Sequence, residues 1–232
     1  MSENGLGPAA FPSLKQMEEE VIAMGLSLLH APEQAAGSIT SGGTDSITMA
    51  VKAARDYARV TRGVHGQANI VAPFSAHPAF DKAAHLMDIE VRRIAVATDL
   101  KSDVNAMAEA VDEHTIMLVG SAPCFPYGLI DHIEALSDLA IAQNTWLHVD
   151  ACVGGYLAPF VRMNGATIQP FDFELAGVHS MSADLHKYGY CAKGASSVLY
   201  RDKSLHAHMV VDCNDWTGGR MIAPTLAGRS HG

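Results

Sequence analysis

The chain has 232 residues, of which 48% are hydrophobic and 18% are charged, and its formal net charge is −9. Such a composition is typical of a soluble globular protein with one large domain or two small ones. The negative charge argues against nucleic acid or an anionic membrane as a partner, because both attract clustered positive charge. No apolar run approaches the length of a membrane span, and residues 1–30 lack the pattern of a signal peptide. The four cysteines form no CxxC pair, so we expect free thiols in a reducing cytoplasm: Cys124, Cys152, Cys191 and Cys213.

Helical and strand patterns alternate along the chain. In chain order they predict a helix over 12–29, a helix over 41–60, a strand over 68–73, a helix over 77–87, a strand over 90–96, a helix over 101–114, a strand over 115–123, a helix over 131–144, and strands over 145–151 and 196–200. This alternation is typical of an α/β fold, in which a mostly parallel sheet has helices on both faces. Such sheets bind ligands at the carboxyl ends of their strands. The loops after 68–73, 115–123 and 145–151 are therefore the places to look for a site.

The spacing of apolar residues also predicts which helix faces are buried. For the first helix the predicted face is Leu14, Met17, Val21, Met24 and Leu28. For the second helix it is Ile47, Ala50, Val51, Ala54 and Tyr57. Asp103 is the expected cap of the helix over 101–114.

A glycine turn, SGGT at residues 41–44, opens the second helix. Gly43 lets the backbone approach a ligand closely, the helix N-terminus presents unpaired N–H groups, and Thr44 adds a hydroxyl. This combination suits a phosphate group, although the motif is neither a P-loop nor GxGxxG. The alternative is an ordinary glycine turn in which Thr44 caps the helix.

Two further residues stand at strand ends. Asp150 ends an apolar strand, where a carboxylate is costly unless a cation pairs with it. It either caps the following loop or pairs with a protonated ring nitrogen, and the small residues after it would let a flat ring lie close. His77 follows the strand over 68–73 and is either a helix-entry histidine or an imidazole stacked on a planar cofactor.

The stretch SADLHKYGYCAKG, residues 182–194, brings His186, Lys187 and Lys193 close together. One interpretation is a basic surface loop, because lysine is rarely buried. The other is a lysine whose amine serves as a nucleophile. Other chemistries have weaker support. His206 and His208 lack an apparent third metal ligand, so no metal site is predicted, and the absence of GxSxG argues against a serine hydrolase.

A phosphate cradle, a stacking histidine, a strand-end carboxylate and a reactive lysine together suit pyridoxal 5′-phosphate (PLP), which needs a lysine and an acidic partner for its ring nitrogen. Here the sequence resembles the type I-fold PLP enzymes, within them the sphingosine-1-phosphate lyase group, which is related to the group II amino-acid decarboxylases. The matching stretches span nearly the whole chain in family order, among them TSGGTDSITMAVKAARD and GSAPCFPYGLIDHI. The highly specific part is HVDACVGG followed by ADLHKYGYCAKG.

The resemblance implies a role for each matching residue. Lys187 resembles the lysine that binds the cofactor covalently, Asp150 the partner of the ring nitrogen, and His77 the residue over the ring. Gly43 and Thr44 correspond to phosphate-binding positions, Cys152 lies near the ring, and His186 lies on the phosphate or lysine side. Lys193 matches a second lysine of the lyase group, which is thought to assist proton transfer or to bind the substrate phosphate. Tyr127 and Leu185 stand where many relatives have histidine and threonine.

The activity that the resemblance implies is cleavage of a carbon–carbon bond in a phosphorylated long-chain base, giving an aldehyde and ethanolamine phosphate. A group II decarboxylase acting on an amino acid is the first alternative, although those enzymes usually have a tryptophan soon after the lysine. A truncated, non-catalytic paralogue or fragment that still binds the cofactor is the second.

The resemblance also bears on domains and assembly. It covers residues 1–232 as a cofactor-binding large domain, and the N-terminal segment and small C-terminal domain of the relatives appear absent. Relatives of this fold place the active site at a two-fold interface, so a homodimer is expected. Residues 215–232 resemble a glycine-rich segment that contributes to that interface, where Trp216 and Met221 would be covered.

Overall fold

The computed structural model describes residues 11–226. Its centre is a seven-stranded sheet whose strands lie in the spatial order β1 (Ala36–Thr40), β7 (Ser196–Tyr200), β6 (Val178–Ala183), β5 (Trp146–Asp150), β4 (Thr115–Ser121), β2 (Asn69–Pro73) and β3 (Glu90–Ile94). Only β7 runs against its neighbours in this sheet, and the pairs from β6 through β3 are all parallel. The expected mostly parallel sheet is therefore confirmed.

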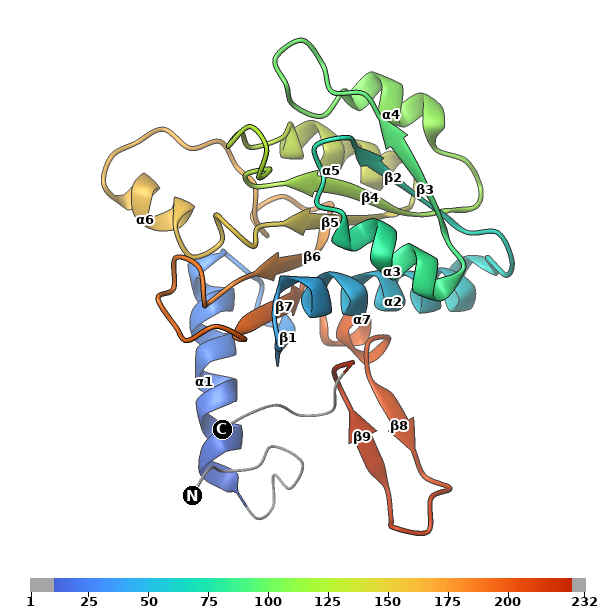
Figure 1. Ribbon diagram of the computed structural model, residues 1–232, viewed down its shortest axis with the longest axis vertical. Helices are drawn as coiled ribbons and strands as arrows, with labels where there is room; N and C mark the ends of the chain where they lie inside the picture. Colours follow the sequence, from blue (N-terminus) through green and yellow to red (C-terminus); the bar gives the residue numbers. More distant parts are fainter. Residues whose placement is uncertain (1–10, 227–232) are drawn as a thin grey trace.

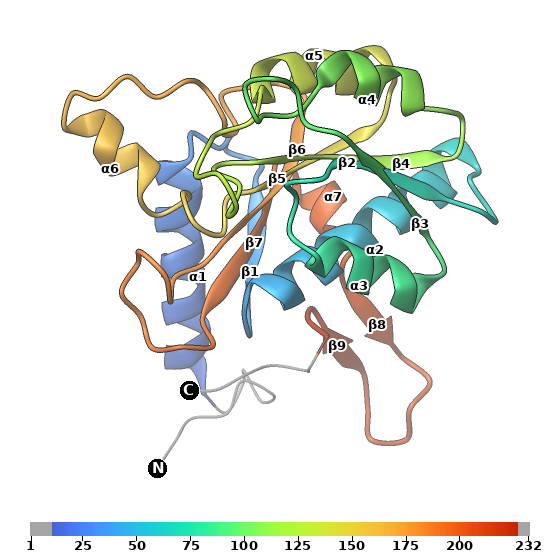
Figure 2. The same cartoon turned by 45° about the horizontal axis from the view of Figure 1, so that its top comes forward.

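Helices cover both faces of the sheet, as predicted (Figures 1 and 2). One face carries α2 (Gly43–Arg62), α3 (Ala79–Met87) and α7 (Lys203–Ala207). The other carries α1 (Pro12–Leu28), α4 (Val104–Ala110) and α5 (Ile133–Ala142), with the short α6 (Ala158–Met163) packed beside them. Each apolar layer is continuous and buried, because side chains on successive residues of a strand point to opposite faces. Along β5, for example, Trp146 packs on the α2 side while Leu147 and Val149 pack on the other.

A hairpin of β8 (Val211–Cys213) and β9 (Met221–Ala223) stands apart from the main sheet (Figure 1). Its apolar residues are largely uncovered: the exposed fraction is 58% for Trp216 and 45% for Met221. The predicted interface segment, residues 215–232, includes β9 and the turn before it but not β8, and residues 227–232 lie outside the described residues.

The predicted buried faces of α1 and α2 differ in how well they agree with the structure. On α2 the predicted apolar face is buried, with Tyr57 packed against the core cluster. On α1 the prediction is wrong for Met17 and Met24, which are exposed, and the rest of the predicted face is only half-buried. The buried residues are Ile22, Gly25 and Leu29. Gly25 explains the rotation. A Cβ on it would lie 2.8 Å from the hydroxyl of Tyr156, so only glycine lets that tyrosine pack so closely.

The sequence pattern did not predict two strands of the sheet, β1 and β6. They flank β7, and β6 lies next to β5. Asp103 caps α4 as predicted, since its carboxylate accepts the N–H of Ala106 at 3.0 Å. The N-terminus of α2 lies beside β1 and β7 in both views (Figures 1 and 2), which places its free N–H groups near the carboxyl ends of β5 and β6.

Candidate active site

A cavity of about 360 Å³ opens where β4, β5 and β6 end and α2 begins. It is lined by most of the residues that the sequence singles out: Gly43, Thr44, His77, Asp150, Cys152, His186 and Lys187. Lys193 is exposed and does not line the cavity. The parallel topology explains the convergence, because neighbouring parallel strands bring their carboxyl ends to the same edge of the sheet.

Lys187 lies in the turn after β6 and pairs with a buried carboxylate. Its Nζ is 3.0 Å from Oδ2 of Asp184, whose side chain is only 2% exposed. The hydroxyl of Ser196 donates to the other oxygen of Asp184 at 2.5 Å, which holds the carboxylate in place. Burial lowers the pKa of Lys187, but the bond to Asp184 and the nearby acidic groups outweigh burial and raise that pKa. Lys187 is thus a cation held at the cavity by a buried carboxylate, while its side chain remains 39% exposed.

Asp150 offers one oxygen to the protein and one to the cavity. Its Oδ1 accepts the backbone N–H of Cys152 at 3.1 Å and the hydroxyl of Ser182 at 3.3 Å. Among the residues that the structure describes, none donates a hydrogen bond to Oδ2. Since Asp150 lines the cavity, this second oxygen is available to a donor on a bound molecule.

The small residues after Asp150 were expected to let a flat ring lie close, but contacts within the protein explain two of them. A Cβ on Gly154 would lie 2.2 Å from the carbonyl oxygen of Ala122, and a Cβ on Gly155 would lie 2.6 Å from the Cβ of Ala183. These glycines therefore let the loop pack between the ends of β4 and β6. Room for a flat ring is not what requires them.

The helix N-terminus has the properties of an anion-binding cradle. Gly42 is the N-cap of α2 and no side chain caps the helix, so the alternative in which Thr44 is the cap is wrong. A Cβ on Gly43 would lie 2.9 Å from Sγ of Cys152 and 3.0 Å from Oδ2 of Asp184. The space beside Gly43 is thus filled by protein on one side and faces the cavity on the other. Free N–H groups and the positive end of the helix dipole favour a phosphate here.

The two histidines are held by backbone groups. Nδ1 of His77 accepts the N–H of Ala79 at 3.1 Å, which places the ring proton on Nε2. His186 is turned the other way, because its Nδ1 lies 2.7 Å from the carbonyl oxygen of Ala195 and must donate to it. Its Nε2 then points toward Asp184, at 3.7 Å from Oδ2. Cys152 is buried, and burial together with the charges of Asp150 and Asp184 raises the pKa of its thiol.

Sequence reasoning missed three polar residues of this region, namely Ser121, Asp184 and Ser182. Ser121 ends β4 and lines the cavity, and its buried Oγ has no hydrogen-bond partner among the described residues. A buried hydroxyl without a partner is uncommon and marks a place where a ligand atom is expected. Recognition of β6 as a strand would have revealed Asp184, because it follows the carboxyl end of that strand.

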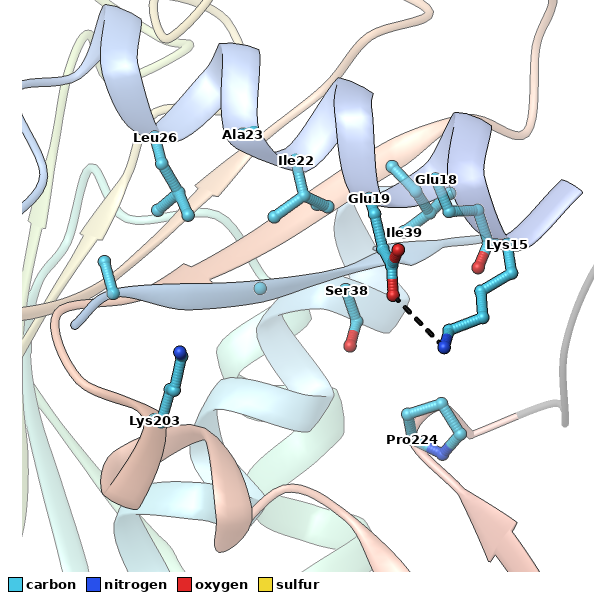
Figure 3. Close-up of a pocket in the computed structure, with 12 residues that line it drawn as sticks. Lys15, Glu18, Glu19, Ile22, Ala23, Leu26, Ser38, Ile39, Lys203 and Pro224 are labelled. Atoms are coloured by element: carbon cyan, nitrogen blue, oxygen red, sulfur yellow. Dashed lines mark ion pairs between the residues drawn. The ribbon is translucent and has the colours of Figure 1, made fainter. Parts of the chain in front are cut away.

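A second cavity, of about 390 Å³, lies between α1, β1 and the start of α7 (Figure 3). Ile22 and Leu26 of α1 form its apolar side, and Lys203 and Pro224 stand across from them. Its charged groups are partly engaged already, as in the ion pair of Lys15 and Glu19 at 3.5 Å. None of the predicted site residues lines it, so its slightly larger volume does not make it the site.

Histidines elsewhere make protein contacts. His206 bonds to the hydroxyl of Ser38 at 2.9 Å and is half-buried. His30, Asp172 and Glu174 come within 4.8 Å of one another. However, His30 already contacts Asp172 at 2.9 Å, and Glu174 pairs with Arg162 at 2.9 Å, so each of these groups has a protein partner without an ion.

The fold and the site together define a cofactor-binding α/β domain with a lysine and a carboxylate facing one cavity. Residues 1–217 match the model of the pyridoxal-dependent decarboxylase conserved domain. The chain therefore belongs to the pyridoxal-dependent decarboxylase family.

Individual relatives refine this placement. The chain is 46% identical over 234 residues to sphingosine-1-phosphate lyase of Oryza sativa subsp. japonica, covering 99% of this chain and 43% of the relative. It is 37% identical to a probable L-tyrosine/L-aspartate decarboxylase of Methanothermobacter thermautotrophicus, over 87% of this chain and 54% of the relative. The solved sphingosine-1-phosphate lyase of Burkholderia pseudomallei K96243 superposes with a TM-score of 0.95 at 42% identity, covering 99% of this chain and 54% of that one. The chain thus spans about half the length of the proteins it matches.

Proposed function

We propose that this chain is the cofactor-binding domain of a PLP-dependent carbon–carbon lyase, which cleaves a phosphorylated long-chain base into an aldehyde and ethanolamine phosphate. One observation carries the proposal. Lys187 and the free oxygen of Asp150 face a single cavity, with the N-terminus of α2 at its side. The lyases among the relatives match over 99% of the chain, whereas the decarboxylase named above matches over 87%.

The residues present fit PLP. Gly43 and Thr44 would hold the phosphate with helix N–H groups, and the unpartnered Oγ of Ser121 would meet a polar atom of the ring. His77 would lie against the ring face, and Oδ2 of Asp150 would accept the ring N–H. When bound, PLP supplies an electron-accepting ring that stabilises the carbanion left by bond cleavage.

The chain's own residues would handle the protons. Lys187 must give up a proton before its amine attacks, and Asp184 is the neighbouring carboxylate that holds the charged form until then. Oδ2 of Asp150 would accept a hydrogen bond from the ring N–H and so favour the protonated ring nitrogen, while the buried Cys152 would help to exclude water from that end of the cavity. Lys193, exposed beside this site, would assist proton transfer or bind the substrate phosphate.

A decarboxylase acting on an amino acid is the second candidate, and the relationship to the Methanothermobacter protein favours it. Such an enzyme would use the same lysine and carboxylate to release CO₂. The two activities are separated by product analysis of protein loaded with PLP: aldehyde and ethanolamine phosphate support the lyase, whereas CO₂ from an amino acid supports the decarboxylase. Binding of PLP with neither product would support the non-catalytic alternative.

We also propose a homodimer in the cytoplasm. The exposed hairpin around Trp216 and Met221 supports the dimer, because aromatic and methionine side chains are enriched at interfaces. The four cysteines, all free thiols, support the reducing compartment. Among the described residues, no helix combines the length and the apolar character needed to cross a membrane. Sedimentation with and without PLP tests the dimer, and a strict monomer at full cofactor occupancy would contradict it.

The covalent assignment has a direct test. Borohydride reduction of PLP-treated protein, followed by peptide mass mapping, should place the label on Lys187. Lys187→Ala should abolish the label, and Lys193→Ala should retain it as the matched control. A label on Lys193 in the unmodified sequence would overturn the assignment.

A further inference from the structure

Behind Asp150 lies a row of buried polar side chains that the proposed chemistry leaves unexplained. Trp146, His148 and Asp150 stand at alternate positions of β5, so they share one face of the sheet. Ser180 and Ser182 stand on the adjacent strand β6. Apart from Asp150, which is 7% exposed, these side chains have an exposed fraction of 1% or less. Buried polar groups are costly unless they are hydrogen-bonded.

The five side chains form a continuous series of contacts. Nε1 of Trp146 donates to Oγ of Ser180 at 2.8 Å, and that oxygen lies 2.7 Å from Nδ1 of His148. On the other side of the imidazole, Nε2 lies 3.3 Å from Oγ of Ser182. Ser182 in turn lies 3.3 Å from Oδ1 of Asp150. The series thus runs from the α2 side of the core to the carboxylate at the cavity.

The ends of the series fix its direction. The indole of Trp146 can only donate, and the carboxylate of Asp150 can only accept. Full burial lowers the pKa of His148 to about 3, so its ring is neutral and carries one N–H. If that proton is on Nε2, then Ser180 donates to Nδ1, Nε2 donates to Ser182, and Ser182 donates to Asp150. Every proton in the series then has an acceptor.

The opposite tautomer leaves groups unpaired. With the proton on Nδ1, His148 would donate to Ser180, whose own hydroxyl proton would have no acceptor among the described residues. Ser182 would have to donate to Nε2, and Asp150 would lose that donor. Each such loss leaves a buried polar group without a partner, which destabilises that arrangement. The thiol of Cys152, which donates to Ser182 at 3.3 Å, is compatible with the first arrangement because a hydroxyl oxygen accepts two bonds.

We propose that Trp146, Ser180, His148 and Ser182 form a one-way series of hydrogen-bond donors that positions the carboxylate of Asp150, with His148 fixed as the Nε2–H tautomer. Ser182 and His148 are then positioning residues: they direct Oδ1 inward and leave Oδ2 for the cavity. The role toward a ring nitrogen rests on the proposed function, whereas the tautomer and the direction of the series do not.

The first test needs neither cofactor nor a variant. Protein labelled with ¹⁵N in its histidine rings is examined by NMR, in which the two ring nitrogens of a neutral imidazole have distinct shifts. A single Nε2–H tautomer for His148, unchanged from pH 5 to 9, is expected. An Nδ1–H tautomer, or a mixture of the two, would overturn the proposal even if the protein binds PLP.

The second test measures, through PLP affinity, whether Ser182 positions the carboxylate of Asp150. Ser182→Ala removes the donor to Oδ1, and PLP binding is expected to weaken about tenfold, as for loss of a hydrogen bond to a charged group. Ser137→Ala is the matched control, because it removes a buried hydroxyl that accepts the N–H of Gly177 and does not line the cavity. Equal affinity of the two variants would refute the positioning role. Failure of the unmodified protein to bind PLP would instead refute the proposed function, and the tautomer measurement would still decide the direction of the series.

Discussion

Replacement of Asp150 by asparagine isolates the charge of the carboxylate from its shape. Asparagine has nearly the same size, and its Oδ1 can still accept the N–H of Cys152 and the hydroxyl of Ser182. The atom turned to the cavity changes from an acceptor oxygen to an NH₂ donor. It would then face the ring N–H of PLP donor to donor. We therefore expect a folded protein in which only the contact with the cofactor is lost.

The size of the effect follows from the type of contact. A hydrogen bond to a charged group contributes about 1.5–3 kcal/mol, which corresponds to roughly 10- to 100-fold weaker PLP binding. Equilibrium dialysis against PLP gives the dissociation constant, and thermal unfolding without PLP checks that the fold is intact.

Asp172→Asn supplies a control of the same kind. Like Asp150, Asp172 is buried and accepts the backbone N–H of the second residue along, that of Glu174, at 3.0 Å. It does not line the cavity, so its replacement should lower stability without changing PLP affinity. If Asp150→Asn bound PLP within threefold of the unmodified protein, or if Asp172→Asn weakened binding equally, the argument about Asp150 would be refuted.

Most of the residues that the sequence singles out line one cavity, but the strand β6, which precedes three of the lining residues, was not predicted. Lys187 and Asp150 could be found because a charged residue next to a buried strand or among glycines is unusual in itself. The strand β6 was missed because His179, Ser180 and Ser182 interrupt its apolar pattern. Ser180 and Ser182 bond mainly to side chains of β5, which are distant in sequence, whereas Nδ1 of His179 contacts the carbonyl oxygen of Gly177. A buried strand that contains several polar residues therefore lacks the apolar pattern from which strands are predicted.

The first helix shows a different limit. Its sequence contains two overlapping apolar stripes, one through Met17 and Met24 and one through Ile22 and Leu29. Periodicity cannot choose between them, because both have helical spacing. The choice is made by Tyr156, which packs onto Gly25. Such close contacts between distant segments are absent from any local pattern.

Two further substitutions test the cradle and the lysine. Gly43→Ala should weaken PLP binding, because the new methyl would crowd Cys152 and Asp184 at the helix N-terminus, and overpacking of this kind costs about 1–3 kcal/mol. Unchanged affinity would contradict the cradle, and thermal unfolding separates a loss of affinity from a loss of stability. Asp184→Asn concerns protonation. Asp184 is the main partner that raises the pKa of Lys187. Replacement of this carboxylate by a neutral amide should lower the pKa of Lys187, so at a given pH a larger fraction of its amine is neutral. Because only the neutral amine attacks an aldehyde, the pH profile for the rate of PLP capture, followed by absorbance after rapid mixing, should shift to lower pH. A profile that stays in place or moves to higher pH would show that Asp184 does not control the protonation of Lys187.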